Sequence, residues 1–326
     1  MINNFFDKDV KIQTDSLTEF AHKILARYGI RKAGVECINF EFNATFAVTT
    51  ETGQKYALRL NINSTRVVSN IRAETQWVRA LARIPSVNVP APIATLDDQF
   101  VVSELHADSG QTIHGVMYSW LEGDEIGDEP TLEQLRTVGQ ALALMHENSA
   151  NFTLTAGAEL PTFNDFFWGT EDYLFSSNST LTPSHRELFE EARDLIMKFT
   201  DELYASSLVH IIHADLHGWN LMWHEDQLFI FDFDDCGYGV EAQDIAVALY
   251  YLDTPAQEAA LLDGYRCIRP LPAYSANAMK ALLLQRRLLL LNYLFETKNT
   301  EHRGMLPAYL EKTIERVSTF LTDVTQ

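Results

Sequence analysis

The first third of the chain carries short runs of alternating apolar and polar residues, broken by two stretches of helical periodicity. Residues 15–29 and 68–82 repeat their apolar positions three and four residues apart, which predicts two amphipathic helices. The runs 37–49 and 55–60 have strand composition on either side of the turn at 50–54. They predict a β-hairpin.

The pattern changes after residue 121. Two more strands, expected at 92–104 and 112–121, complete the sheet-rich first part. The acidic segment 123–130 contains Gly and Pro and is typical of a linker. Helical spacing then covers 131–147, 184–205, 240–252 and much of 255–322. We therefore expect an α+β fold with a small β-rich lobe, residues 1–121, and a larger, mainly helical lobe, residues 122–326.

One strand-rich insert interrupts the helical part at residues 208–235. It contains the polar loop HADLHGWN (213–220) and, after a polar turn, the run LFIFDF. This run is apolar on both faces and predicts a buried strand. Asp232 and Asp234 lie at its end, where carboxylates are costly unless they bind something.

The polar loop and the strand end together carry the residue types of a metal site. Asp215 and Asn220 lie in the loop, and one tight hairpin separates them from Asp232, so we expect these side chains to lie close together. Carboxylate and amide oxygens suit Mg²⁺, which keeps water and substrate phosphates in its other positions. Arg59, at the end of a strand, and Glu74, in the next helix, could form a pair that contacts the phosphates.

Composition narrows the class of partner. The chain has 25 basic and 45 acidic residues and a net charge of −20. This balance argues against nucleic acid and against an anionic membrane surface, and it is compatible with a cationic small molecule. The three cysteines show no metal-binding spacing and the N-terminus no signal-peptide pattern, so we expect a cytoplasmic protein. The apolar stretch 281–295 is interrupted by Gln285, Arg286 and Arg287 and is too short to span a bilayer.

Several motifs in this order resemble the aminoglycoside phosphotransferase/choline kinase-like family, with homoserine-kinase-like members closest. The matching segments are YALRL (56–60), the helix with Glu74, ALMHENS (143–149), HADLHGWN (213–220), IFDFDDCGYG (230–239) and QDIA (243–246). The resemblance covers roughly residues 36–250. It implies a bilobal protein-kinase-like fold, ATP and Mg²⁺ as cofactors, and transfer of the γ-phosphoryl group to a hydroxyl.

The resemblance also implies roles for residues of HADLHGWN (213–220) and IFDFDDCGYG (230–239), and for Asp244. Asp215 would be the catalytic base, or would orient the substrate hydroxyl for attack on the γ-phosphoryl group. Asn220 and Asp232 would hold Mg²⁺, with Asp234 as a second candidate contact. Asp244 would brace the catalytic loop from beneath.

Nucleotide contacts are implied for the first lobe. Arg59 would take the phosphate-binding position where many kinases have lysine, and Glu74 would orient it. Residues 117–121 (MYSWL), with Tyr118 and Trp120, would form the hinge that binds adenine.

Two departures from the family pattern concern the phosphates. An arginine replaces the usual lysine, and its planar fork differs from a compact ammonium group. The segment 39–45 contains no glycine, although a glycine-rich turn covers the phosphates in many kinases. Asn43 and Thr45 could donate hydrogen bonds there instead.

The partner is expected to be a small molecule with a hydroxyl group. The acidic balance favours an amino alcohol, followed by homoserine and related amino acids, and the family also accepts aminoglycosides and protein hydroxyls. His217, Trp219 and Asp235 are candidate substrate contacts, although loop packing explains the first two equally well. The oligomeric state is open.

Two alternatives to a kinase stay open at this point. HADLH places His213, Asp215 and His217 at alternating positions, with His210 and His224 nearby, which would suit a metal-dependent hydrolase. The arginine substitution and the glycine-free loop would also suit a nucleotide-binding regulator without catalytic activity.

Overall fold

The structure, a computed structural model, describes residues 5–176 and 179–325 and divides into two compact units. The first unit comprises Met1–Asp124, Phe152–Leu160 and Met222–Asp234. The second comprises Glu125–Asn151, Pro161–Leu221 and Asp235–Gln326. Each unit is therefore built from segments that are far apart in the sequence. The lobe boundary expected at residue 121 stays a prediction.

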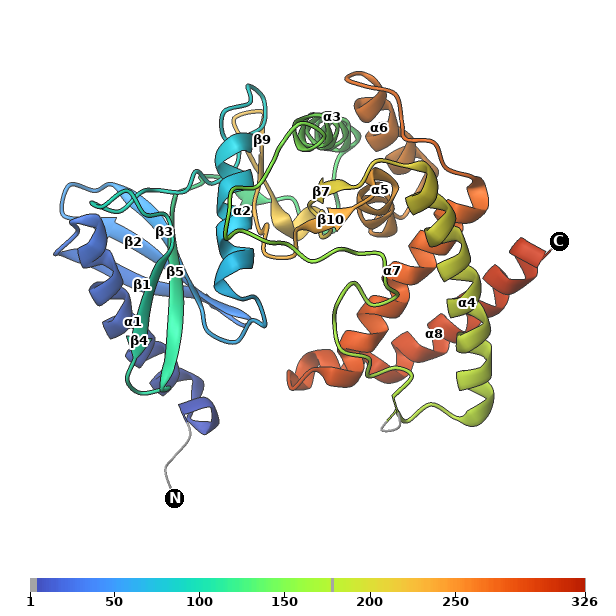
Figure 1. Cartoon of the computed structure of the whole chain (residues 1–326), viewed down its shortest axis with the longest axis horizontal. Coiled ribbons are helices and arrows are strands. Elements are labelled where there is room, and N and C mark those ends of the chain that lie inside the picture. Colours follow the sequence, from blue (N-terminus) through green and yellow to red (C-terminus); the bar gives the residue numbers. More distant parts are fainter. Residues whose placement is uncertain (1–4, 177–178, 326) are drawn as a thin grey trace. The chain divides into compact units, whose positions relative to one another are not determined.

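A five-stranded antiparallel sheet forms the centre of the first unit (Figure 1). Its strands are β1 (Ala33–Phe40), β2 (Asn43–Thr50), β3 (Lys55–Asn61), β4 (Val102–His106) and β5 (Gln111–Ser119), in the order β1-β2-β3-β5-β4. The predicted hairpin is β2–β3. The expectation of one strand over 37–49 is wrong, because the chain reverses at Glu41 and Phe42, where the Glu41 N–H donates to the Asn43 carbonyl (3.0 Å).

Two helices complete this part of the first unit, as predicted. They are α1 (Val10–Leu25) and α2 (Val68–Leu81), and short 3-10 turns flank α1 at Phe5–Asp7 and Ala26–Tyr28. Leu17 on α1 packs into one hydrophobic core with Phe46 and Leu58 of the sheet. Helix α1 starts before the predicted position because the Asp9 side chain caps it by accepting from the Lys11 N–H (2.8 Å).

A second, smaller sheet precedes Asp232 and Asp234 in the chain. It contains β6 (Asp124–Glu125), β8 (Leu221–His224) and β9 (Gln227–Ile230). The β8–β9 turn has positive φ at both Glu225 and Asp226, the backbone geometry of a tight two-residue hairpin. Ile230 is fully buried, and its N–H donates to the Asn88 carbonyl (2.9 Å). The predicted strand is therefore present, but it ends at Ile230, and Phe229 within it is only half-buried.

Helices dominate the second unit. They are α3 (Leu132–Ser149), α4 (Pro183–Ser206), α5 (Glu241–Tyr250), α6 (Pro255–Arg266), α7 (Ala276–Glu296) and α8 (Thr300–Thr325). Hydroxyl side chains cap four of their N-termini: Thr131, Thr182, Thr254 and Ser275. Helices α4, α7 and α8 share a core around Phe189, Leu288 and Val317. Across the described residues, no helix has both the length and the apolar character needed to cross a bilayer.

A small antiparallel pair positions the catalytic loop predicted from the sequence. Strand β7 (His210–Ile212) pairs with β10 (Gly237–Gly239), and the polar loop follows β7 directly. The loop ends in a 3-10 turn, Gly218–Asn220, before β8. The pairing of β7 with β10 therefore fixes the point at which the loop leaves the core.

Candidate functional site

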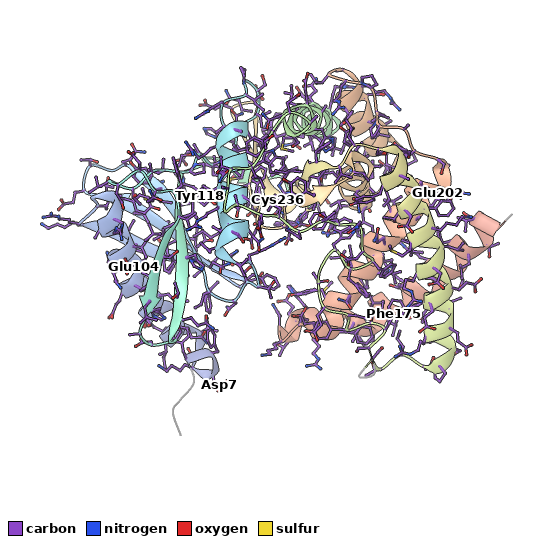
Figure 2. The ribbon with its side chains drawn as sticks, in the orientation of Figure 1. Asp7, Glu104, Tyr118, Phe175, Glu202 and Cys236 are labelled. Atoms are coloured by element: carbon purple, nitrogen blue, oxygen red, sulfur yellow. The ribbon has the colours of Figure 1, made fainter. Side chains whose placement is uncertain are left out.

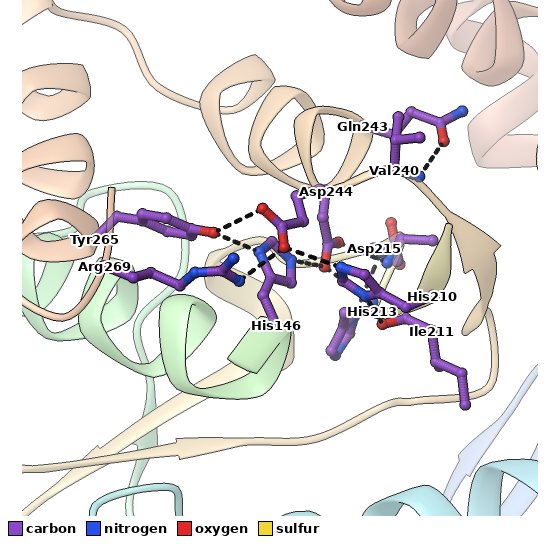
Figure 3. A network of polar contacts seen from close by, with 12 residues as sticks. His146, His210, Ile211, His213, Asp215, Val240, Gln243, Asp244, Tyr265 and Arg269 are labelled. Atoms are coloured by element: carbon purple, nitrogen blue, oxygen red, sulfur yellow. Dashed lines mark hydrogen bonds and ion pairs between the residues drawn. The ribbon is translucent and has the colours of Figure 1, made fainter. Parts of the chain in front are cut away.

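The polar loop of the second unit is held by a buried carboxylate beneath it. Ala214 has φ of 68°, which is unfavourable for a residue with a Cβ and persists only where neighbours enforce it. Asp244, in the first turn of α5, supplies this restraint by accepting from the backbone N–H groups of His213 (3.0 Å) and Ala214 (2.8 Å). Figure 3 shows this carboxylate between the loop and His146, whose Nε2 lies 3.0 Å away.

Asp244 is fully buried, yet it stays ionised. Burial by itself raises its pKa, but hydrogen bonds and the charges of His146 and His213 outweigh burial, so the pKa lies below its usual value. A charged acceptor is a strong partner for two backbone donors. Asp244 therefore lies where the family resemblance places the brace of the loop.

Asn220 fixes the proposed catalytic residue within the loop. Its Nδ2 donates to the backbone carbonyl (2.8 Å) and to Oδ2 (3.1 Å) of Asp215. These two bonds set the orientation of the amide and turn its oxygen away from Asp215. An oxygen turned in this way can coordinate a hard cation.

A buried arginine, Arg286 of α7, forms an ion pair with Asp215 Oδ1. On the other side of the carboxylate, His217 Nε2 lies 3.3 Å from Oδ2. Burial raises the pKa of Asp215, but Arg286 and the hydrogen bond from His217 more than offset this, so its pKa lies far below the ordinary value.

Sequence reasoning missed Arg286, which stood out only as a charge within an apolar stretch. A buried cation in a helix needs a partner, and this rule was the available signal.

The first unit brings together Arg59 and Glu74, as the sequence predicts. Arg59 on β3 pairs with Glu74 on α2, and the hydroxyl of Tyr118 donates to Glu74 (3.1 Å). Figure 2 labels Tyr118 on the sheet. Burial lowers the pKa of Arg59, but Glu74, Tyr118 and Asp234 outweigh burial and raise it above its usual value. The result is a permanently charged guanidinium with a fixed orientation.

Asp234 joins the same network. Its Oδ2 accepts from Asn43 Nδ2 (3.0 Å), and its Oδ1 lies 3.7 Å from Arg59 Nη1. That Oδ1 is buried and has no hydrogen bond among the described residues. The structure thus brings Asp234 to Arg59 and to the glycine-free turn, and its role as a metal contact stays a prediction.

Asp232 lies just after the buried hairpin, in a backbone geometry that few residues adopt. Its φ is 59°, in the left-handed region, and its side chain is exposed. The next residue, Phe233, is buried edge-on against Trp77, with ring centroids 5.5 Å apart. The aromatic anchor therefore fixes the backbone that carries Asp232. Its proximity to Asn220 stays a prediction.

The chemistry of these donors fits magnesium bound together with a triphosphate. Within the described part of the chain, no three His, Cys, Asp or Glu side chains gather as a metal site. A magnesium ion that keeps phosphate and water ligands needs only one or two protein oxygens. The amide oxygen of Asn220 and the carboxylate of Asp232 are suitable donors of this type.

The structure does not support the hydrolase alternative. His210 Nε2 lies 3.0 Å from Glu241 Oε1 and its Nδ1 3.1 Å from the carbonyl of Ile211, so both nitrogens have partners. His213 Nδ1 accepts from the backbone N–H of Asp215 (3.3 Å). These imidazoles stabilise the loop.

The candidate substrate residues of the loop line a small pocket in the second unit. Trp219 is half exposed, and its Nε1 donates to Asp128 (2.8 Å). The rings of His217 and Tyr251 contact each other at a tilt of 42°, with centroids 4.8 Å apart, and all four side chains line the pocket. Asp235, the third candidate, is exposed, and its charge helps to raise the pKa of Arg286.

The predicted hinge residues differ in their surroundings. The hydroxyl of Tyr118 donates a hydrogen bond to Glu74. Trp120 lies under Lys55, whose Nζ is 5.5 Å from the ring, and its buried Nε1 has no hydrogen-bond partner among the described residues. Adenine binding by these two residues stays a prediction.

The model of one protein family, described as the phosphotransferase enzyme family (APH), matches residues 41–276. The chain belongs to this phosphotransferase family. The match includes the polar loop 213–220, the Arg59–Glu74 pair and the segment 230–239. The resemblance deduced from the motifs is therefore confirmed.

Two proteins similar to this chain, one in sequence and one in structure, are described as kinases. Amicoumacin kinase of Bacillus subtilis (strain 168) is 25% identical over 226 residues, which are 69% of this chain. The chain spans 65% of the length of that relative. The structure of the microcompartment-associated aminopropanol kinase has a TM-score of 0.79 and 25% identity, with 94% of this chain and 98% of that chain covered.

A third similarity concerns the fold alone. The structure of amicoumacin kinase hAmiN has a TM-score of 0.73 and 19% identity, and the match covers 94% of this chain and 96% of that chain. The predicted α+β, protein-kinase-like fold is confirmed by these structures, with the β-rich part first and the helical part second.

Proposed function

We propose that this phosphotransferase catalyses transfer of the γ-phosphoryl group of ATP to a hydroxyl of a small molecule. Family membership and the named relatives support the reaction class. The single observation that carries the proposal is the arrangement of the loop. Asp215 is ionised and fixed on both oxygens, and Asn220 presents its amide oxygen for a cation.

In the proposed reaction, the acceptor oxygen attacks the γ-phosphorus and the bond to the bridging β–γ oxygen breaks. Asp215 accepts a hydrogen bond from the attacking hydroxyl and takes up its proton as the new P–O bond forms. ADP leaves with the bridging oxygen. Asp244 and Asn220 act by holding the loop, which places the carboxylate before the acceptor arrives.

We propose that Arg59, oriented by Glu74, contacts the phosphates of ATP, and that Asn220 and Asp232 hold Mg²⁺. When bound, the metal neutralises negative charge on the phosphate oxygens. Amicoumacin kinase hAmiN was solved with AMP-PNP and Ca²⁺, which supports a nucleotide and a divalent cation as the cofactors. Asn43, placed beside Asp234, is a candidate contact at the glycine-free turn.

The proposed acceptor is a small amino alcohol. The similarity to aminopropanol kinase and the net charge of −20 support this class. Trp219 and Asp128 join an aromatic ring to a carboxylate beside the small pocket, and this combination attracts a primary ammonium group.

The test is an ADP-release screen with Mg-ATP over amino alcohols, amino acids and aminoglycosides. A matched pair, 1-amino-2-propanol and 1,2-propanediol, isolates the contribution of the amine. We expect turnover with the amine and much less without it. Tight ATP binding without ADP release over the whole panel would contradict the proposal and favour a regulator without activity.

A further inference from the structure

Two adjacent arginines on α7 are buried, and their partners differ. Arg287 binds groups of α8 and α5: Nε donates to Thr313 Oγ1 (2.9 Å), Nη2 to the Tyr309 carbonyl (3.1 Å) and Nη1 to the Tyr250 hydroxyl (3.2 Å). Arg286 instead pairs with Asp215 of the catalytic loop. Their exposed fractions are 9% for Arg286 and 5% for Arg287, so each cation depends on protein partners. The two residues differ in what they hold.

The side chain of Arg286 belongs to a closed ring of four residues. Its Nη2 pairs with Asp215 Oδ1 and also donates to the Tyr251 hydroxyl (2.7 Å). The ring of Tyr251 packs on His217, and His217 Nε2 returns to Asp215 Oδ2 (3.3 Å). Each member contacts two others, so the carboxylate and its partners restrain one another.

The two oxygens of the carboxylate are therefore held by different elements. Asn220 and His217, both in the loop, bind Oδ2, whereas Arg286 reaches Oδ1 from a distant helix. The Nε of Arg286 is buried without a hydrogen-bond partner among the described residues. A structural arginine would be expected to satisfy this donor, so the contacts with Asp215 and Tyr251 best account for where the side chain lies.

We infer that Arg286 is a positioning residue, which fixes the Asp215 carboxylate, directly and through Tyr251, in the orientation that meets the acceptor hydroxyl. The inference rests on the function proposed above. In this role Arg286 acts through Asp215 and touches neither ATP nor the acceptor. Its loss therefore acts on the chemical step, while binding of ATP through other residues is retained.

The experiment compares three variants by steady-state kinetics and thermal unfolding. Arg286→Met is expected to lower kcat about 10²-fold, the typical cost of a misplacement near 1 Å. The KM for ATP should stay within about twofold, because uniform binding is unchanged. Arg286→Lys should recover part of kcat, since an ammonium group keeps the charge but loses the planar guanidinium geometry by which Nη2 reaches both Asp215 and Tyr251. Arg287→Met is the matched control and should lose thermal stability but keep kcat.

The outcomes separate this inference from the proposed function. An Arg286→Met protein with wild-type kcat, or equal losses of kcat in Arg286→Met and Arg287→Met where both are folded, would overturn the positioning role alone. If Arg287→Met does not fold, Arg287→Lys replaces it as the control. A wild type that releases no ADP with any acceptor would overturn the proposed function and the positioning role with it.

A second measurement tests the ion pair without activity. Asp215→Ala should lower the thermal midpoint in the wild type, because it leaves Arg286 buried and unpaired, and should lower it much less in the Arg286→Met background. Equal shifts in the two backgrounds would show that the two side chains do not interact, and would overturn the inference.

Discussion

Each unit contains a buried arginine–carboxylate pair that we assign to its proposed site, and the two pairs are arranged in opposite ways. In the first unit Arg59 is the shared member, held by Glu74, by Asp234 and by the ring of Tyr118, 5.6 Å away. In the second unit the carboxylate of Asp215 is the shared member, held by Arg286, Asn220 and His217. The group with several neighbours is, in both cases, the one to which we assign direct contact with a substrate.

This difference predicts an order of effects. Removal of a shared group, Asp215 or Arg59, should abolish the substrate contact that we assign to it. Removal of one of its neighbours should leave the shared group in place, held by its other partners. The expected effects therefore decrease from Asp215 to Arg59 and then to Asp234. A neighbour whose loss equals the loss of the shared group would contradict this interpretation.

The largest effect is expected for Asp215→Asn. The variant keeps the shape and the acceptor oxygen for Arg286 but cannot take a proton, so kcat should fall about 10³-fold. Binding of Mg-ATP, measured by calorimetry, should be unchanged because the nucleotide contacts are proposed for other residues. Wild-type turnover in this variant would remove Asp215 from the mechanism.

The next effect is expected for Arg59→Met in the first unit. Loss of the guanidinium removes the proposed phosphate contact, so the KM for ATP should rise and kcat should fall, by about tenfold or more together. Glu74→Gln should have a smaller effect, since Asp234 still contacts Arg59. The comparison is made at equal folded fractions, checked by thermal unfolding. A larger loss in Glu74→Gln than in Arg59→Met would invert the assignment.

Asp234→Asn should have a smaller effect and distinguishes two roles of this residue. As a neighbour of Arg59 and Asn43, its loss should raise the KM for ATP about threefold to tenfold, at any concentration of Mg²⁺. As a metal ligand, its loss should instead raise the Mg²⁺ concentration needed for half-maximal activity. Titration of activity with Mg²⁺ in wild type and variant decides between the two.

Sequence reasoning found one pair and missed the other for physical reasons. Glu74 lies on the helix that directly follows the strand of Arg59, so a local pattern contains both residues. Arg286 lies on a helix beyond the family motifs, and its contact with Asp215 depends on how α7 packs in the second unit. Hydrophobic periodicity predicted the helices well because their apolar faces form the core.

Local turns and side-chain hydrogen bonds were not predictable in the same way. The turn between β1 and β2 is one example, because no glycine or proline marks it and the run 37–49 looks like one strand. The position of Asp234 is another. The structure brings it to Asn43 and Arg59, contacts that the sequence did not indicate, and its role as a metal contact stays a prediction.

The smallest effect on activity is expected at a third arginine–carboxylate pair, formed by Arg269 and Glu241, to which we assign no contact with a substrate. Arg269 Nη1 donates to Glu241 Oε1 (2.7 Å), and His210 Nε2 lies 3.0 Å from the same oxygen. Burial raises the pKa of Glu241, but the hydrogen bond from His210 and the charges of His146, Arg269 and His210 lower it to about 2.

Because this pKa is depressed in the folded state, Glu241 stabilises the protein above its unfolded pKa, near 4.5, and the contribution is lost as pH falls towards 2. Glu241→Gln should therefore have a lower thermal midpoint than the wild type at pH 6. The difference between the two proteins should shrink as the pH is lowered from 5 to 3, while kcat at neutral pH stays close to the wild-type value. A constant difference in midpoint over this range would show that the charge of Glu241 does not stabilise the fold. A loss of kcat comparable to that of Arg286→Met would show that buried arginine pairs in the second unit act on turnover wherever they lie, and would remove the distinction between the pairs.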